Sequence, residues 1–199
     1  MPRGQIQDRI IRVLLVNPQG TLTRYRISML ANCSWQWVLE LLRKLERMGL
    51  TKGTAVVDYS GLIRYWLKTR LQRDFRDYML QDPLDLIQRS DLTYALTTYQ
   101  AENMIQHYLF PSRTDAYVLS EDLEKWQKQI LDAGGLVGRG NFRLLLADSY
   151  ALYGALGSSG YKIVCRPQLI VDLLAEGGPA KEAGELLLQK VTSHPLSTV

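Results

Sequence analysis

The chain has 199 residues, 46% of them hydrophobic, and a formal net charge of +4 at neutral pH. This length allows one large domain or two small ones, and the composition is normal for a globular protein with a buried core. No run approaches the roughly 18 to 20 apolar residues that span a bilayer, and the N-terminus lacks an apolar secretory segment. We therefore expect no membrane contact and a cytoplasmic location.

The charges are distributed unevenly along the chain. Residues 1–73 contain 13 Lys and Arg against 4 Asp and Glu, whereas residues 74–199 contain 11 against 16. A basic first part is expected if it meets a polyanion, and an acidic second part is expected to meet a different partner.

Two elements are predicted before residue 24. The apolar spacing indicates a helix from Gln5 to Val16, which the turn residues 17–20, Asn-Pro-Gln-Gly, bring to an end. Thr21–Thr23 then suit a brief strand.

The stretch 27–50 predicts a short helix, a tight turn and a longer second helix. Ser34 is placed to cap the second helix, and Gly49 is placed to end it in a left-handed conformation. The second helix has apolar residues at offsets of zero, three, four and seven, which is the spacing of a buried helical stripe: Val38, Leu41, Leu42 and Leu45.

The opposite arc of this second helix is polar and mostly cationic. It contains Gln36, Glu40, Arg43, Lys44 and Arg47, with Trp37 on its flank. A helix-turn-helix unit uses such an arc because the major groove admits one helix whose outer side chains contact base edges and phosphates. The alternative is the solvated face of an ordinary helical hairpin.

Two β-rich runs follow, at Ala55–Tyr59 and Leu62–Leu67, and predict a hairpin that turns at Ser60-Gly61. Together with the preceding helices, this order resembles the winged-helix family of DNA-binding domains. The resemblance is carried by Leu30-Ala31, Ser34, Val38, Leu42, Leu45 and Gly49-Leu50. It implies that the hairpin is a wing and that Lys52 and Arg64 contact phosphates. Exposed strand cations that discourage edge pairing are the alternative explanation of these two residues.

Beyond residue 70 the pattern predicts an α/β domain. Lys68–Arg76 is a charged connector that continues as helix, and Pro83 suits the first turn of the next helix. Further strands are predicted at 92–98, 115–119, 143–147 and 161–164, and further helices at 100–109, 121–133, 168–175 and 180–191. The predicted fold class is mixed α/β, with a winged helix-turn-helix domain over residues 1–70 and a smaller-sheet, antitoxin-like α/β domain over residues 71–199.

Two stretches of this second domain resemble the type IV abortive-infection antitoxins, the AbiEi family. They are Tyr94-Ala95-Leu96-Thr97 followed by Ala101, and Pro167, Leu169, Val171 and Asp172-Leu173-Leu174. The sequence departs from the family pattern at Thr98, where glycine is expected. The resemblance implies an antitoxin that represses its own two-gene operon and neutralises a partner toxin of the nucleotidyltransferase type.

The sequence predicts no catalytic residue, metal site or cofactor. The two cysteines lie far apart and the chain has two histidines, which excludes a paired-cysteine zinc site and a multi-histidine metal site. Gly157-Ser158-Ser159-Gly160 is similar to the Gly-Ser that opens nucleotidyltransferase sites, but the next carboxylate is a lone Asp172, and such sites need paired carboxylates for magnesium. A turn is the better interpretation of this segment.

The expected function is therefore that of a DNA-binding transcriptional regulator. Its partners are double-stranded operator DNA, a nucleotidyltransferase-type toxin and, for a symmetric operator, a second copy in a homodimer. Base contacts are expected from Gln36, Trp37, Glu40 and Lys44, and phosphate contacts from Arg24, Arg26, Arg43, Arg47 and Arg64. Ser34 and Lys52 complete the predicted DNA-binding set. The alternatives are a winged-helix protein-interaction module without DNA binding and a nucleotidyltransferase-like enzyme.

Overall fold

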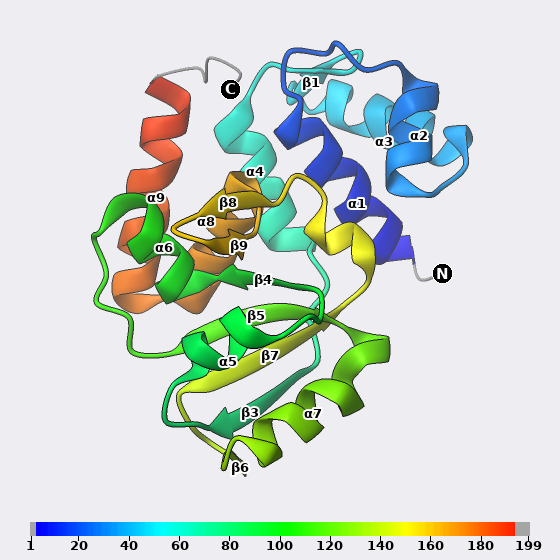
Figure 1. Cartoon of the computed structure of the whole chain (residues 1–199). Helices are drawn as coiled ribbons and strands as arrows, with labels where there is room; N and C mark the ends of the chain where they lie inside the picture. Colours follow the sequence, from blue (N-terminus) through cyan, green and yellow to red (C-terminus); the bar gives the residue numbers. More distant parts are fainter. Residues whose placement is uncertain (1–2, 194–199) are drawn as a thin grey trace.

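The computed structural model describes residues 3–193 and shows a mixed α/β fold with a seven-stranded sheet (Figure 1). The helices are α1 (Arg3–Val16), α2 (Arg24–Ala31), α3 (Trp35–Arg47), α4 (Tyr59–Thr69), α5 (Pro83–Arg89), α6 (Thr98–Gln106), α7 (Leu123–Asp132), α8 (Arg166–Glu176) and α9 (Gly178–Ser193), with short 3-10 turns η1 (Ser120–Asp122) and η2 (Ser149–Leu152). The strands are β1 (Thr51–Lys52), β2 (Ala55–Val56), β3 (Phe75–Met79), β4 (Tyr94–Thr97), β5 (Thr114–Leu119), β6 (Leu136–Val137), β7 (Phe142–Ala147), β8 (Leu156–Ser158) and β9 (Tyr161–Ile163). The predicted mixed α/β class is confirmed.

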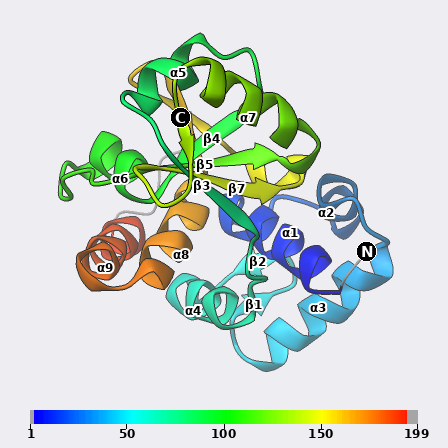
Figure 2. The same ribbon diagram turned by 90° about the horizontal axis from the view of Figure 1, so that it is seen from below.

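The large sheet has the strand order β6-β3-β7-β5-β4-β9-β8 and lies between two layers of helices. Strand β5 is parallel to β7, and β4 is parallel to β9, while the other neighbours are antiparallel. Figure 2 shows α5 and α7 on one face, and α8 with α1 and α4 on the other. Side chains confirm both layers: Trp126 of α7 meets Tyr94 of β4 edge-on, and Tyr117 of β5 donates a hydrogen bond to Asp172 of α8.

Helix α1 is the helix around which α2, α3 and α4 are arranged. Most of its residues are buried, including the charged Asp8, Arg9 and Arg12, so the helix is covered on nearly every side. Helices α2, α3 and α4 pack against it, and α8 connects it to the sheet. One continuous apolar core therefore runs from α1 through α4 and α8 to the sheet.

The predicted wing hairpin is wrong in its position and length. Residues Leu62–Leu67 lie within helix α4, and the hairpin consists of the two-residue strands β1 and β2. The reason is that Leu62, Ile63, Tyr65 and Trp66 repeat with helical spacing and are all buried along one side of α4. Asp58 caps this helix by accepting a hydrogen bond from the Gly61 N–H at 2.7 Å, so Gly61 belongs to a helix start and not to a hairpin turn.

Two further local predictions are wrong for related reasons. Thr21–Thr23 form no strand, because the Thr23 hydroxyl caps α2 by accepting from the N–H of Arg26. The helix predicted through Lys68–Arg76 stops at Thr69, and β3 begins at Phe75. Between them, the N–H of Leu71 donates to the carboxylate of Asp8 on α1, which holds this segment outside a helix.

Candidate nucleic-acid interface

Helix α3 is fixed at both ends and along one face. The Ser34 hydroxyl accepts a hydrogen bond from the N–H of Trp37 at 3.4 Å and caps the first turn. Gly49 has a φ of +71°, a left-handed conformation that glycine adopts without strain. The predicted stripe is buried: Val38, Leu41, Leu42 and Leu45. The sequence prediction of this helix is therefore confirmed, and its opposite face points to solvent.

The exposed face of α3 is polar along its length. Gln36, Glu40, Arg43 and Arg47 follow one another at spacings of three or four residues, and all four are exposed. Lys44 is exposed beside them, with its ammonium 5.3 Å from the centre of a ring on α4, that of Tyr65. Both ribbon views place α3 at the periphery, remote from α5 and α7 (Figures 1 and 2).

The two tryptophans of α3 differ in exposure, and the more exposed one is not the one that the sequence analysis selected for base contact. Trp37 is half-buried and packs against the core, so only part of its ring is presented outward. Trp35 is instead 54% exposed. Its position directly after the cap residue Ser34, before the buried stripe begins, is the signal that marks it as exposed.

Further exposed cations flank α3. Arg24 and Arg26 lie in the first turn of α2, and Lys52 lies on β1, the first strand after α3. We call the six exposed cations of α2, α3 and β1 the basic arc: Arg24, Arg26, Arg43, Lys44, Arg47 and Lys52. Within residues 3–193 no ion pair neutralises any of them.

Glu46 is an acidic residue inside this basic surface, and the structure explains its presence. Its carboxylate accepts a hydrogen bond from the Gly53 N–H at 3.1 Å, which attaches the β1–β2 turn to α3. Glu46 also lines a shallow hollow together with Arg43 and Arg47. The contact therefore fixes the position of the neighbouring Lys52 relative to α3. Sequence patterning gave no indication of it.

Arg64 is separated from the basic arc. It lies on α4, not on a wing, and its guanidinium binds both carboxylate oxygens of Glu185 on α9 at 3.1 and 2.9 Å. Its placement as a wing residue is corrected by the helical structure of this segment.

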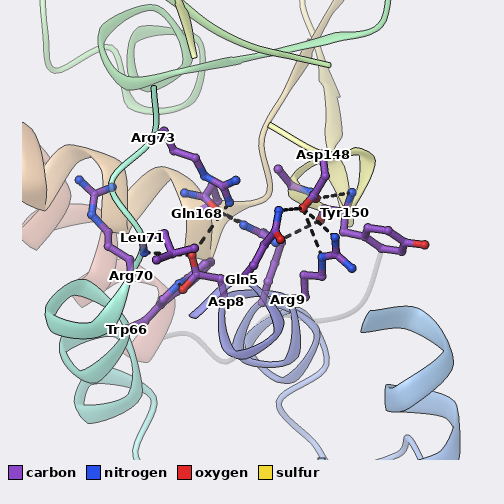
Figure 3. Close-up of polar contacts among 12 residues, drawn as sticks. Gln5, Asp8, Arg9, Trp66, Arg70, Leu71, Arg73, Asp148, Tyr150 and Gln168 are labelled. Carbon is purple, nitrogen blue, oxygen red and sulfur yellow. Dashed lines mark hydrogen bonds and ion pairs between the residues drawn. The ribbon is translucent and has the colours of Figure 1, made fainter. Parts of the chain in front are cut away.

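Several other cations of the first part are bound by side chains of the second part, as Figure 3 shows for Arg9 and Asp148. Arg9 binds Asp148 at 2.9 Å, and Arg70 binds Asp172 at 3.2 Å. Arg12 is fully buried and donates to the side-chain oxygen of Gln168 at 2.6 Å. The uneven charge along the sequence is thus partly neutralised within the fold. The surplus that remains on the surface of the first part is concentrated in the basic arc.

The buried Asp172 is bonded by four donors. Thr97, Gln168, Tyr117 and Arg70 approach its two oxygens at 2.7 to 3.2 Å. Burial raises the pKa of Asp172, and the charge of Arg70 with the three hydrogen bonds offsets part of that rise. With both oxygens already occupied, this carboxylate has a structural role in joining α8, β4 and β5.

The remaining candidate for chemistry is a hairpin turn. Gly157 and Ser158 end β8, and Ser159 and Gly160, which both have positive φ as expected for a tight turn, join it to β9. Among the residues that the structure describes, no group of three or more His, Cys, Asp or Glu side chains is placed to hold a metal ion.

Comparison with known proteins adds no further assignment. No protein-family model, no curated protein and no solved structure matches this chain. Within the described range, none of the helices has the length and apolar character needed to cross a bilayer.

Proposed function

We propose that the protein is a sequence-specific DNA-binding regulator and that α3 is its reading helix. The observation that carries this proposal is the outer face of α3, which is polar, exposed along the whole helix and bordered by cations without ion-pair partners. Such a face fits the major groove, which is wide enough for one α-helix and lined by phosphates on both sides.

The position of each side chain suggests its role in the complex. Gln36 and Glu40, in the first half of α3, are suited to hydrogen bonds with base edges, and Trp35 adds an exposed aromatic surface beside them. The members of the basic arc are suited to phosphates. The β1–β2 hairpin is too short for a long wing, so we assign Lys52 to backbone phosphate at the edge of the same groove.

The antitoxin resemblance supports a narrower form of this proposal. In that form the protein represses its own operon, acts as a homodimer on a symmetric operator and counteracts a nucleotidyltransferase-type toxin. One structural detail agrees with the family's sequence pattern: Thr98, where that pattern has glycine, has a φ of +48°, a conformation that favours glycine. We propose no catalytic step for this chain.

A salt titration of duplex binding tests the proposal. If all six cations of the basic arc meet phosphates, affinity should fall about a thousandfold between roughly 50 and 200 mM salt. Arg43→Ala and Arg47→Ala should each reduce the slope of log affinity against log salt by about 0.9. Lys128→Ala, which removes an exposed cation of α7, is the matched control and should leave the slope unchanged. Weak, salt-insensitive binding of the wild-type protein would reject the regulator.

The second candidate is a protein-interaction module without DNA binding. It is favoured by exposed apolar side chains next to the basic arc, namely Tyr25 (69% exposed) and Met29 (57% exposed) on α2. This candidate predicts that the Arg43 and Arg47 variants leave duplex binding at the same low level as the wild-type protein.

A further inference from the structure

A buried arginine connects the turn before the reading helix to the sheet. Arg9 of α1 is 4% exposed, and its guanidinium donates to the carbonyl of Ala31, the last residue of α2, at 3.4 Å. A cation at the C-terminal end of a helix also interacts favourably with the unpaired carbonyl groups there. Asn32 and Cys33 follow at once and lead to Ser34, the cap of α3.

The other side of the same guanidinium is bound by Asp148, directly after strand β7 of the sheet. One carboxylate oxygen of Asp148 accepts from Arg9 Nε and Nη2 at 3.3 and 2.9 Å and from the side chain of Gln5 (Figure 3). The other oxygen accepts from the N–H groups of Tyr150 and Ala151 and caps η2. The ring of Tyr150 lies against the guanidinium, 4.0 Å from its centre to the Arg9 carbon.

Electrostatics agree with this geometry. Burial raises the pKa of Asp148. The hydrogen bond and charge of Arg9, together with the charges of Arg73 and Arg12, outweigh this effect, so the pKa of Asp148 lies below its usual value. Asp148 is therefore ionised at neutral pH, and both of its oxygens are used by the fold.

We propose that Arg9 is a positioning residue for α3, which it holds in a fixed relation to the sheet by bonding Ala31 and Asp148 at the same time. The effect of Arg9 on DNA binding rests on the proposed function, whereas its effect on the position of α3 does not. Arg9 is too deeply buried to reach a phosphate. It acts through the α2–α3 turn, so the loop after β7 belongs to the DNA-reading unit although it lies more than 100 residues away in the sequence.

Amide hydrogen exchange in the full chain tests the link without DNA. Asp148→Asn keeps the size and the η2 cap of Asp148 but replaces the oxygen facing Arg9 with an amide group. Exchange at Asn32 and Cys33, whose N–H groups bond Met29 and Ser28, should accelerate roughly tenfold, as expected for the loss of a charge-assisted hydrogen bond. Arg9→Lys should do the same, because one ammonium cannot replace the planar fork of arginine at both sites.

The matched control is Asp77→Asn in the sheet. Asp77 also binds an arginine through two hydrogen bonds, at 2.7 and 2.9 Å to Arg143, and that guanidinium also lies over a ring, Phe75. Its loss should not change exchange at Asn32 or Cys33. Equal acceleration in the control, or none in Asp148→Asn, would overturn the proposal.

The DNA measurement uses a duplex that the wild-type protein selects from a randomised pool and a scrambled duplex of the same composition. Asp148→Asn should weaken binding to the selected duplex roughly tenfold. The salt dependence of binding and the affinity for the scrambled duplex should stay unchanged, because no phosphate contact is lost. Unchanged affinity for the selected duplex would reject the role of Arg9 in DNA reading. If the wild-type protein selects no duplex, the proposed function fails, and the exchange measurement alone decides whether Arg9 positions α3.

Discussion

Replacing Thr98 by valine should destabilise the protein by removing one hydrogen bond while leaving the shape of the side chain nearly unchanged. Thr98 is buried at the junction of β4 and α6, and its hydroxyl donates to the carboxylate of Asp115, which is 1% exposed. Asp115 also binds Arg113 through two hydrogen bonds, at 2.5 and 2.9 Å. Valine preserves the volume and the branched Cβ, so the strain of the left-handed backbone is the same in both proteins.

The expected cost follows from the lost hydroxyl alone. A hydrogen bond to a charged group contributes about 1.5 to 3 kcal/mol, and the buried carboxylate is left with fewer donors, so Thr98→Val should cost about 2 kcal/mol. Thr98→Ser keeps the hydroxyl and removes one methyl group, which should cost about 1 kcal/mol or less.

Urea unfolding followed by circular dichroism measures both variants. With a denaturant dependence of about 2 kcal/mol per molar urea, the midpoint of Thr98→Val should fall by about 1 M and that of the serine variant by less than half of this. If Thr98→Val unfolds at the wild-type midpoint, the hydrogen bond to Asp115 does not stabilise the fold and the reasoning is refuted.

Two further predictions concern the sheet. The hydrogen bond from Arg143, with its charge, lowers the pKa of Asp77 below the usual value, so the stabilisation by this pair is present above about pH 4 and is lost as the pH falls through the lowered pKa. Thermal unfolding should show a stability difference between the wild-type protein and Asp77→Asn at pH 7 that shrinks below pH 4; a constant difference would contradict the assignment. A methyl group on Gly140 would lie 2.2 Å from the carbonyl oxygen of Tyr78, so Gly140→Ala should lower stability by about 1 to 3 kcal/mol. Gly157→Ala, which meets open space, is its control, and equal stability of the two variants would show that the strand can shift.

Helix α3 was predictable because its determinants are local. The cap residue Ser34, the stripe of buried residues and Gly49 lie within one short stretch, and each acts on its immediate neighbours. The exposed face follows from the same periodicity. The strands β4, β5, β7 and β9 and the helices α8 and α9 were predicted for the same reason, with boundaries close to those observed.

Helix α4 was mistaken for a strand because its composition and its spacing give opposite indications. Tyr65 and Trp66 are residue types common in strands, and Ser60-Gly61 is a common turn sequence. The structure decides in favour of spacing, because a helix buries Leu62, Ile63, Tyr65 and Trp66 together against α1 and α8. Tertiary packing thus overrides local β propensity in this segment.

The contacts between α1 and the second part could not be predicted from the sequence. An arginine in an apolar helix has no recognisable partner until the fold brings a distant residue to it. The partners of Arg9 and Arg12 lie 139 and 156 positions away, at Asp148 and Gln168. Composition indicated a basic first part and an acidic second part, but not which of these charges would meet inside the molecule.

This sequence separation has a consequence for folding during synthesis. Helix α1 is synthesised before the side chains that bind its two buried arginines, because Asp148 and Gln168 follow Arg9 and Arg12 by 139 and 156 positions. Burying these guanidinium groups earlier would leave Arg12 without its hydrogen bonds and Arg9 with its bond to the Ala31 carbonyl alone, at a large cost in free energy. Closure of helices α1 to α4 over these groups is therefore expected to be a late event in folding, because contacts between such distant positions form slowly.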